Sequence, residues 1–163
     1  MNTAIVYYSL NGNTEFAVKK IARQTGADLI PIHPVKAYPD KGFKKFFWGG
    51  KSAVMGEKPE LEKYRFDAEK YQLIVFATPV WASNIAPPIR TFIEDNRSEL
   101  KDKKFAAITC FSGGGADKAI ARLKDFLGTD SLCAELLLID PKDKPDSAND
   151  TKLTDFCKKL NEL

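Results

Sequence analysis

Short apolar runs, separated by polar loops, recur along the chain and predict its strands. The runs over residues 4–8, 71–77, 104–111 and 132–139 are rich in apolar side chains. The first is β-branched and aromatic, and the second is continuous. Such runs are typical of strands that are buried on both faces of a parallel sheet. A further run, over residues 28–34, contains two prolines, and proline within a strand favours a position at the edge of the sheet.

The segments between these runs carry apolar residues at helical spacing. Helices are expected over residues 15–22, from Pro87-Pro88 onward, over residues 116–127 and over residues 150–163, the last with Asn149 or Asp150 as its N-terminal cap. An amphipathic helix is also expected over residues 42–55, although Gly49-Gly50 should weaken it. The alternation of strands and helices predicts an α/β fold, with a parallel sheet between two layers of helices, in a single domain over residues 1–163.

Composition narrows the class of protein. The chain has 163 residues, of which 44% are hydrophobic and 29% charged, and this balance is typical of a globular domain. We expect no membrane insertion, because no apolar run approaches the roughly 20 residues that span a bilayer. The N-terminus lacks the pattern of a signal peptide, and three cysteines without C-x-x-C spacing indicate buried free thiols, so a cytoplasmic location is expected. The net charge of +3 comes from interspersed charges and does not indicate nucleic-acid binding.

Three polar loops with unusual composition follow predicted strands, at residues 9–14, 78–84 and 112–115. The carboxyl ends of parallel strands meet at one edge of a sheet, and ligands of such folds bind there. We therefore expect the three loops to form one ligand site. No catalytic residue and no metal-ligand cluster stands out in them or elsewhere in the chain.

The first loop, Ser9-Leu10-Asn11-Gly12-Asn13-Thr14, lies between a strand and the start of a helix. Free backbone N–H groups and the helix dipole favour an anion at such a place. The loop has no lysine or arginine, so the G-x-x-x-x-G-K-[ST] pattern of nucleotide-hydrolysing enzymes is absent. A phosphate held by backbone amides, hydroxyls and side-chain amides is expected. The alternative is an ordinary turn that Asn13 or Thr14 caps.

The other two loops suit a flat ring. Trp81, with Pro79 before it, could stack on an aromatic ligand, although a tryptophan of the core or of an interface would look the same. Ser112-Gly113-Gly114-Gly115 offers backbone without side chains for close approach, or forms only a flexible turn.

The first loop resembles the phosphate loop of flavodoxins, with Asn11 where threonine is commoner, and the other two loops fall where flavodoxins enclose the flavin ring. The resemblance covers nearly the whole chain and implies a five-stranded sheet of order 2-1-3-4-5 that binds FMN non-covalently. It implies that Trp81 flanks the ring, that the backbone of residues 82–84 lies near its N5 edge and that residues 112–114 approach its pyrimidine edge. The cofactor-binding residues implied in this way are Ser9, Asn11, Gly12, Asn13, Thr14, Thr78, Pro79, Val80, Trp81, Ala82, Ser83, Asn84, Ser112, Gly113 and Gly114.

Two functions fit this resemblance. The first is an FMN-binding redox protein that carries electrons between cytoplasmic partners, either a redox partner protein or a small electron acceptor. The second is an NAD(P)H-dependent flavin or quinone reductase on the same fold. A phosphoacceptor signalling domain shares the topology, but it needs acidic residues where this chain has Tyr8-Ser9 and Thr78-Pro79.

The chain also departs from the acidic composition and the tyrosine-bearing last loop of electron-shuttle flavodoxins. Low negative charge near the ring is expected to raise the reduction potential of the flavin. The basic, aromatic segment over residues 36–58 is expected to be a crossover helix, with a lid or a docking surface for an acidic partner as the alternative.

Overall fold

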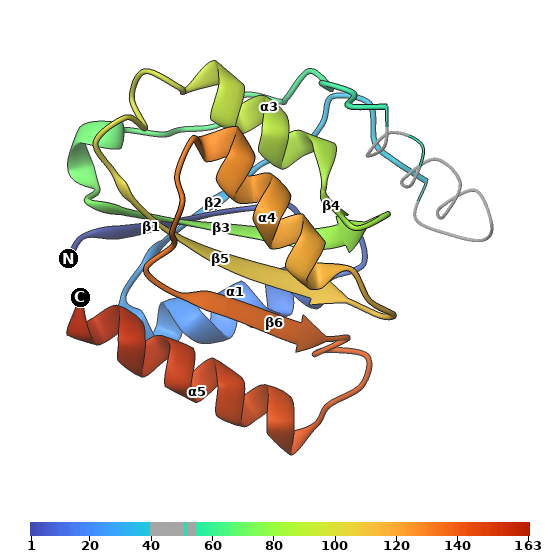
Figure 1. Cartoon of the computed structure of the whole chain (residues 1–163), viewed down its shortest axis with the longest axis vertical. Coiled ribbons are helices and arrows are strands. Elements are labelled where there is room, and N and C mark those ends of the chain that lie inside the picture. The colour runs from blue at the N-terminus through green and yellow to red at the C-terminus, as the bar shows by residue number, and fades with distance from the viewer. Residues whose placement is uncertain (40–50, 52–54) are drawn as a thin grey trace.

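A parallel five-stranded sheet organises the molecule. The computed structural model describes residues 1–39, 51 and 55–163 (Figure 1). Nearly all of the helix expected over residues 42–55 lies outside the described residues. The parallel strands run in the order β2-β1-β3-β5-β6, and this order confirms the expected topology. Their bounds are Thr3–Tyr7 for β1, Asp28–Pro31 for β2, Leu73–Trp81 for β3, Lys104–Phe111 for β5 and Glu135–Ile139 for β6.

Helices cover both faces of this sheet (Figure 1). Side chains alternate across a strand, so Val6 packs toward the face that α3 and α4 cover, whereas Ile5 packs toward the face that α1 and α5 cover. Both residues are fully buried. The helices are α1 (Asn13–Thr25), α3 (Pro87–Asp95), α4 (Ala116–Leu127) and α5 (Ser147–Glu162), with a short 3-10 turn, η1, at Ala68–Lys70.

Apart from the helix expected over residues 42–55, the expected elements are present, but several boundaries differ. The last helix begins at Ser147, and the carboxylate of Asp146 caps it by accepting a hydrogen bond from the backbone N–H of Ala148 at 3.0 Å. Asn149, the expected cap, is buried instead, and its side-chain amide bonds the backbone of Ile139 at the end of β6. The helix therefore starts early enough for Asn149 to fix it against the sheet.

The largest difference lies after β3. This strand does not end at residue 77 but continues to Trp81, turns at Ala82 and Ser83, and pairs with a short antiparallel strand, β4 (Asn84–Ile85). The expected loop over residues 78–84 is thus a hairpin. The edge strand β6 starts at Glu135 rather than at residue 132, so Cys133 precedes this strand and is only partly buried. Cys110 and Cys157 are buried, as expected.

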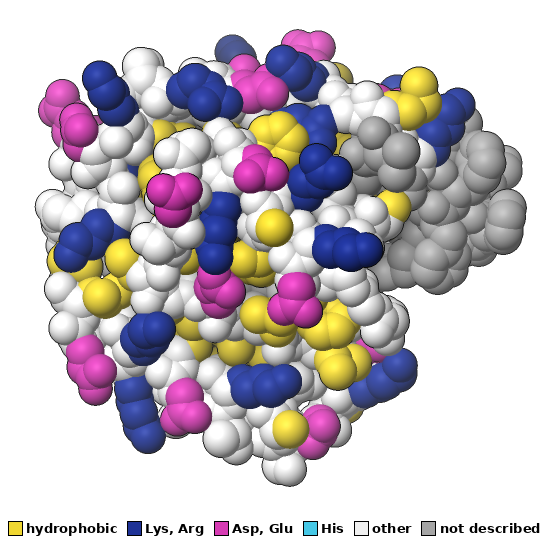
Figure 2. All heavy atoms as spheres, viewed as in Figure 1, with side chains coloured by type: hydrophobic (Ala, Val, Ile, Leu, Met, Phe, Trp, Pro, Cys, Tyr) yellow, Lys and Arg dark blue, Asp and Glu magenta, His cyan; other side chains and the backbone are white. Residues whose placement is uncertain are grey.

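The distribution of charge over the surface agrees with the small net charge of the chain. Basic and acidic side chains are interspersed over the face shown in Figure 2. Over the described residues, no helix is both long and apolar enough to cross a membrane. Within the same part of the chain, no group of three or more His, Cys, Asp or Glu side chains could hold a metal ion.

Candidate functional site

The three polar segments line one cavity of about 260 Å³ at the carboxyl edge of the sheet. Eleven of the residues singled out in the sequence line it, namely Ser9, Asn11, Asn13, Thr14, Pro79, Val80, Trp81, Ala82, Ser112, Gly113 and Gly114. Gly12, Thr78, Ser83 and Asn84 do not line it. Four further residues line it that were not among the cofactor-binding residues named from the sequence, namely Leu10, Cys110, Phe111 and Asp140. Leu10 belongs to the expected first loop, whereas Asp140 lies outside all three expected loops.

The first loop is wound tightly around the hydroxyl of Ser9. This oxygen accepts hydrogen bonds from the backbone N–H groups of Gly12 and Glu15, each at 3.2 Å. Gly12 has a φ of 87°, in the left-handed region that favours glycine, and this turn leads directly into α1. Among the described residues, the backbone N–H groups of Asn13 and Thr14 have no acceptor. The loop thus presents free donors at a helix N-terminus, which is the arrangement that binds an anion.

The side chain of Asn13 has a different role from the one expected. Its oxygen accepts hydrogen bonds from the backbone N–H groups of Lys142 and Asp143, and its NH₂ group donates to the Asp143 carboxylate at 2.7 Å. Asn13 therefore joins the first loop to the connection between β6 and α5. Asn13 contributes its backbone to the cavity, whereas its side-chain amide is hydrogen-bonded elsewhere.

The same connection brings a cation to the first loop. The ammonium of Lys142 donates to the backbone oxygen of Asn11 at 2.5 Å and lies 3.2 Å from the Asp143 carboxylate. A Cβ built on Gly12 would lie 3.1 Å from this ammonium. The first loop has no basic residue of its own, so Lys142 supplies a positive charge that the local sequence does not reveal.

The second segment holds its tryptophan in an aromatic cluster. The ring of Trp81 packs edge-on against Tyr8, with 5.7 Å between centroids, and against Tyr38, with 5.2 Å. Edge-to-face packing of this kind stabilises a fixed ring orientation. Burial raises the pKa of Tyr8, so its hydroxyl stays protonated at neutral pH. Trp81 is half-buried, and it presents a fixed aromatic surface at the cavity.

Thr78 lies below the cavity and stabilises the hairpin. Its buried hydroxyl accepts a hydrogen bond from the backbone N–H of Ala86 and donates to the carbonyl of Pro79, each at 2.9 Å. The turn above it is strained, because Ala82 and Ser83 have φ values of 48° and 59°. Both are left-handed conformations that a Cβ disfavours.

The third segment meets this strained turn at Gly115. A Cβ on Gly115 would lie 2.3 Å from the hydroxyl of Ser83 and 2.9 Å from its Cα. Only glycine therefore fits there. A Cβ on Gly113 or Gly114 would meet no atom within 4 Å. The backbone of residues 113 and 114 is thus open to the cavity, whereas Gly115 holds the segment against the hairpin.

A carboxylate completes the cavity beside Ser112. Asp140 accepts a hydrogen bond from the Ser112 hydroxyl at 2.6 Å and pairs with the Lys144 ammonium at 2.8 Å. Burial alone would raise the pKa of Asp140, but the hydrogen bonds from Lys144 and Ser112 outweigh it and hold the pKa below its ordinary value of 3.8. The cavity therefore contains a negative charge at neutral pH.

The thiol of Cys110 lies at the inner wall of the cavity. Burial raises its pKa to about 12, although the Thr14 hydroxyl nearby lowers it somewhat. The thiol is therefore protonated at neutral pH and is a poor nucleophile, because the thiolate is the reactive form.

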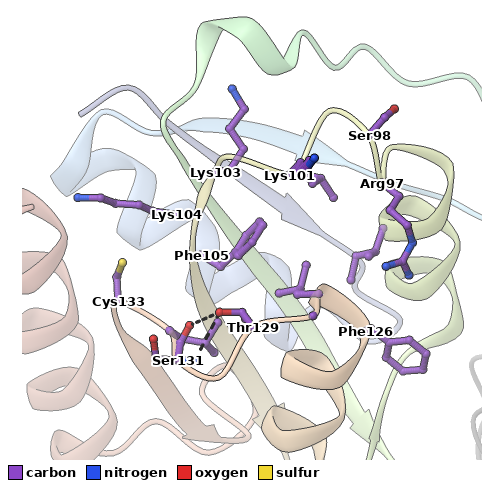
Figure 3. Close-up of a pocket in the computed structure, with 15 residues that line it drawn as sticks. Arg97, Ser98, Lys101, Lys103, Lys104, Phe105, Phe126, Thr129, Ser131 and Cys133 are labelled. Atoms are coloured by element: carbon purple, nitrogen blue, oxygen red, sulfur yellow. Dashed lines mark hydrogen bonds between the residues drawn. The ribbon is translucent and has the colours of Figure 1, made fainter.

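A larger cavity lies elsewhere in the described residues. It has about 670 Å³ and lies at the opposite edge of the sheet, where β5 begins (Figure 3). Lys103 and Lys104 point away from one another there, and neither converges on the cavity. Both buried polar atoms that lack a hydrogen-bond partner among the described residues belong to other regions, at Arg90 and Thr109.

Comparison with known proteins identifies the fold family. A family model described as Flavodoxin matches residues 2–155. The chain belongs to the flavodoxin family. The match covers all three cavity-forming segments and the connection that carries Asp140 and Lys142. No curated protein matches this flavodoxin-family chain.

Solved structures share its fold. A flavoprotein from Lactobacillus acidophilus in complex with FMN is 21% identical, with a TM-score of 0.70 over 87% of this chain and 95% of that one. The flavodoxin of Megasphaera elsdenii, in its two-electron reduced form, is 20% identical, with a TM-score of 0.52 over 98% and 96%. An NAD(P)H:quinone oxidoreductase from Methanothermobacter marburgensis is 12% identical, with a TM-score of 0.51 over 100% and 96%. At these identities the likeness shows the fold.

Proposed function

We propose that the cavity binds FMN non-covalently and that the chain carries electrons between cytoplasmic partners, either a redox partner protein or a small acceptor. The observation that carries this proposal is the convergence of unpartnered backbone donors, a fixed aromatic ring and bare glycine backbone on one cavity. Such a set suits a ligand with an anion at one end and a flat ring at the other. Three free cysteines are consistent with a reducing compartment.

The phosphate end of FMN fits the first loop. The backbone N–H groups of Asn13 and Thr14 would donate to it, and the Lys142 ammonium would offset part of its negative charge. Ser9 would act indirectly, because its hydroxyl already fixes the loop through Gly12 and Glu15.

The ring end of FMN fits the other two segments. Trp81 would flank the isoalloxazine, and the open backbone of Gly113 and Gly114 would allow its edge to approach closely. The cavity volume of about 260 Å³ lies just below the roughly 300 Å³ at which enclosed small-molecule sites begin. Part of the ring would therefore stay accessible to an electron donor or acceptor.

The cofactor would supply the redox chemistry, accepting one or two electrons, while the protein holds the ring and tunes its electronics. Asp140 would act on the potential through its charge, and its hydrogen bond from Ser112 would fix the third segment. The Cys110 thiol would take no covalent part, because it is protonated and buried.

A reductase that takes electrons from NAD(P)H is the second candidate. The observation that favours it is a basic cavity on the other side of the Ala82–Ser83 turn, which Ala82 shares with the FMN cavity. A substrate could bind there next to the ring. Turnover of NADPH with a quinone acceptor by the FMN-loaded protein separates this candidate from a pure electron carrier.

Cofactor titration tests the proposal directly. We expect the purified protein to be yellow, or to become so with added FMN, and to release FMN on denaturation. Failure to bind added FMN at micromolar concentration would refute the proposed cofactor.

The substitution Lys142→Gln tests the position of the phosphate. Loss of the ammonium should weaken FMN about three- to tenfold and riboflavin less than twofold, because riboflavin has no phosphate. Lys152→Gln removes the same charge from an exposed position on α5 and should change neither affinity. Equal weakening of FMN and riboflavin by Lys142→Gln would mean that the phosphate does not lie at the first loop.

A further inference from the structure

A second cavity, of about 440 Å³, lies on the far side of the Ala82–Ser83 turn. Three cations line it, Arg90 from α3 and Lys118 and Arg122 from α4, and one carboxylate, Asp125, lines it with them. Among the described residues, none of the three cations forms an ion pair with a carboxylate. The cavity therefore carries an excess of positive charge that the described protein groups leave unbalanced.

Arg90 is the unusual member of this set. It is only 9% exposed, yet its Nε has no hydrogen-bond partner among the described residues. A buried donor without a partner is costly, and a charged one more so. Burial lowers the pKa of Arg90, and the nearby Arg122 lowers it further, while the Glu94 carboxylate raises it. Glu94 itself is already paired with Lys58.

The position of the Arg90 guanidinium is fixed. Its central carbon lies 4.3 Å from the centroid of the Phe126 ring, which supports the guanidinium face as a cation–π contact. A Cβ built on Gly56 would lie 2.5 Å from one of its terminal nitrogens. The guanidinium is therefore held between an aromatic face and backbone without a side chain, which is an arrangement suited to a planar, multidentate donor.

We infer that this basic cavity binds the phosphate group of a small-molecule substrate that reaches over Ala82 to the neighbouring cavity. A dianionic phosphate would pair with the Arg90 guanidinium and balance the charge of Lys118 and Arg122 together, which one carboxylate could not do. Ala82 lines both cavities, so a ligand anchored by its phosphate can extend to the place where the flavin ring is proposed. The inference that this substrate reacts at the flavin ring rests on the proposed function. The inference of a phosphate site does not.

Titration of the FMN-loaded protein with inorganic phosphate at constant ionic strength tests the site. The bound FMN would occupy the first loop, so that this loop does not compete for the added phosphate. The Nε–H signal of Arg90 and the amide signals of Ser83 and Lys118 are followed by nuclear magnetic resonance. We expect these signals to shift together and to saturate. An unchanged Arg90 signal up to high phosphate concentration would overturn the inference.

Matched variants assign the binding to the cavity. Arg122→Gln should weaken phosphate about tenfold, because it removes one charge-assisted contact. Arg97→Gln removes another exposed guanidinium, at the opposite edge of the sheet, and should leave the affinity unchanged. Lys118→Gln provides a second exposed variant in the cavity. Equal weakening by Arg97→Gln would show that general charge attraction, rather than a site, holds the anion.

Phenyl phosphate distinguishes a substrate from a free anion. We expect it to bind more tightly than inorganic phosphate and to change the flavin absorbance, because its ring would extend over Ala82. Equal affinities with an unchanged flavin spectrum would refute the substrate assignment and leave a free-anion site. If the protein fails to take up FMN at all, the proposed function fails, and the Arg90 signal in the cofactor-free protein still reports on the phosphate site separately.

Discussion

The contact between Gly115 and Ser83 holds two of the three cavity-forming segments together, and the substitution Gly115→Ala tests it. Gly115 precedes α4 with a φ of 85°, and a Cβ there would lie 2.3 Å from the Ser83 hydroxyl and 2.9 Å from both its Cα and its Cβ. The hydroxyl can rotate away, but the Cα belongs to a turn that is already strained. The added methyl must therefore displace backbone.

Two costs combine to give the expected magnitude. A residue other than glycine in the left-handed region costs about 1–2 kcal/mol. Forcing a methyl group into a filled space costs about 1–3 kcal/mol. We expect Gly115→Ala to lower the free energy of unfolding by about 2–5 kcal/mol, and the melting temperature by roughly 5–15 °C for a chain of this size.

Urea unfolding of three variants separates the two costs. Gly128→Ala is the backbone control, because Gly128 has a φ of 68° but a Cβ there would meet nothing within 4 Å. It should lose about 1–2 kcal/mol. Gly113→Ala has neither problem and should stay within about 0.5 kcal/mol of the parent. If Gly115→Ala is no less stable than Gly128→Ala, the close contact with Ser83 does not exist and the two segments are not held together in this way.

Three further predictions concern single groups of the site. Asp140→Asn should lower the free energy of unfolding by about 1–2 kcal/mol at pH 7. Because the folded pKa of Asp140 lies below 3.8, this deficit should persist down to about pH 4 and shrink as the pH falls further, and a deficit that does not depend on pH would contradict the assignment. Ala82→Gly should relieve left-handed strain and raise the free energy of unfolding by up to about 1 kcal/mol, as urea unfolding would measure, and a loss of stability would show that the turn is unstrained. In the native protein, iodoacetamide should modify Cys133 well before Cys110, as mass spectrometry would detect, and early modification of Cys110 would contradict its burial.

The sheet could be predicted because its central strands are encoded locally. The strands at residues 71–77 and 104–111 are apolar on both faces, as the two buried cores require, and α4 occupies its expected range. The hairpin after β3 could not be predicted. A two-residue turn of this kind is signalled by Asn-Gly or Asp-Gly, whereas this chain has Ala82-Ser83. The turn is strained because Ala82 and Ser83 stand where the residues that favour left-handed conformations are usual.

The residues of the cavity likewise divide into those that the sequence reveals and those that it does not. Its backbone donors and glycines follow strands directly and are visible as sequence motifs. Asp140 and Lys142 are not visible, because each acts on a loop that lies far away in the sequence. Asp140 contacts Ser112, 28 positions earlier, and Lys142 contacts Asn11, 131 positions earlier. No local pattern in the polar connection between β6 and α5 distinguishes these two residues from their neighbours.

The charge inside the cavity changes the expectation for the reduction potential. The net charge of +3 and the glycine-rich third loop would favour the anionic reduced form of the proposed flavin. Asp140 opposes this effect, because its carboxylate lies at the cavity itself and stays ionised at neutral pH. A charge that lines the cavity would outweigh exposed charges beyond about 10 Å, because salt screens the distant charges. Lys144 pairs with Asp140 and offsets part of its field. The potential of the proposed flavin would therefore depend on how tightly this pair is held rather than on the composition of the whole chain.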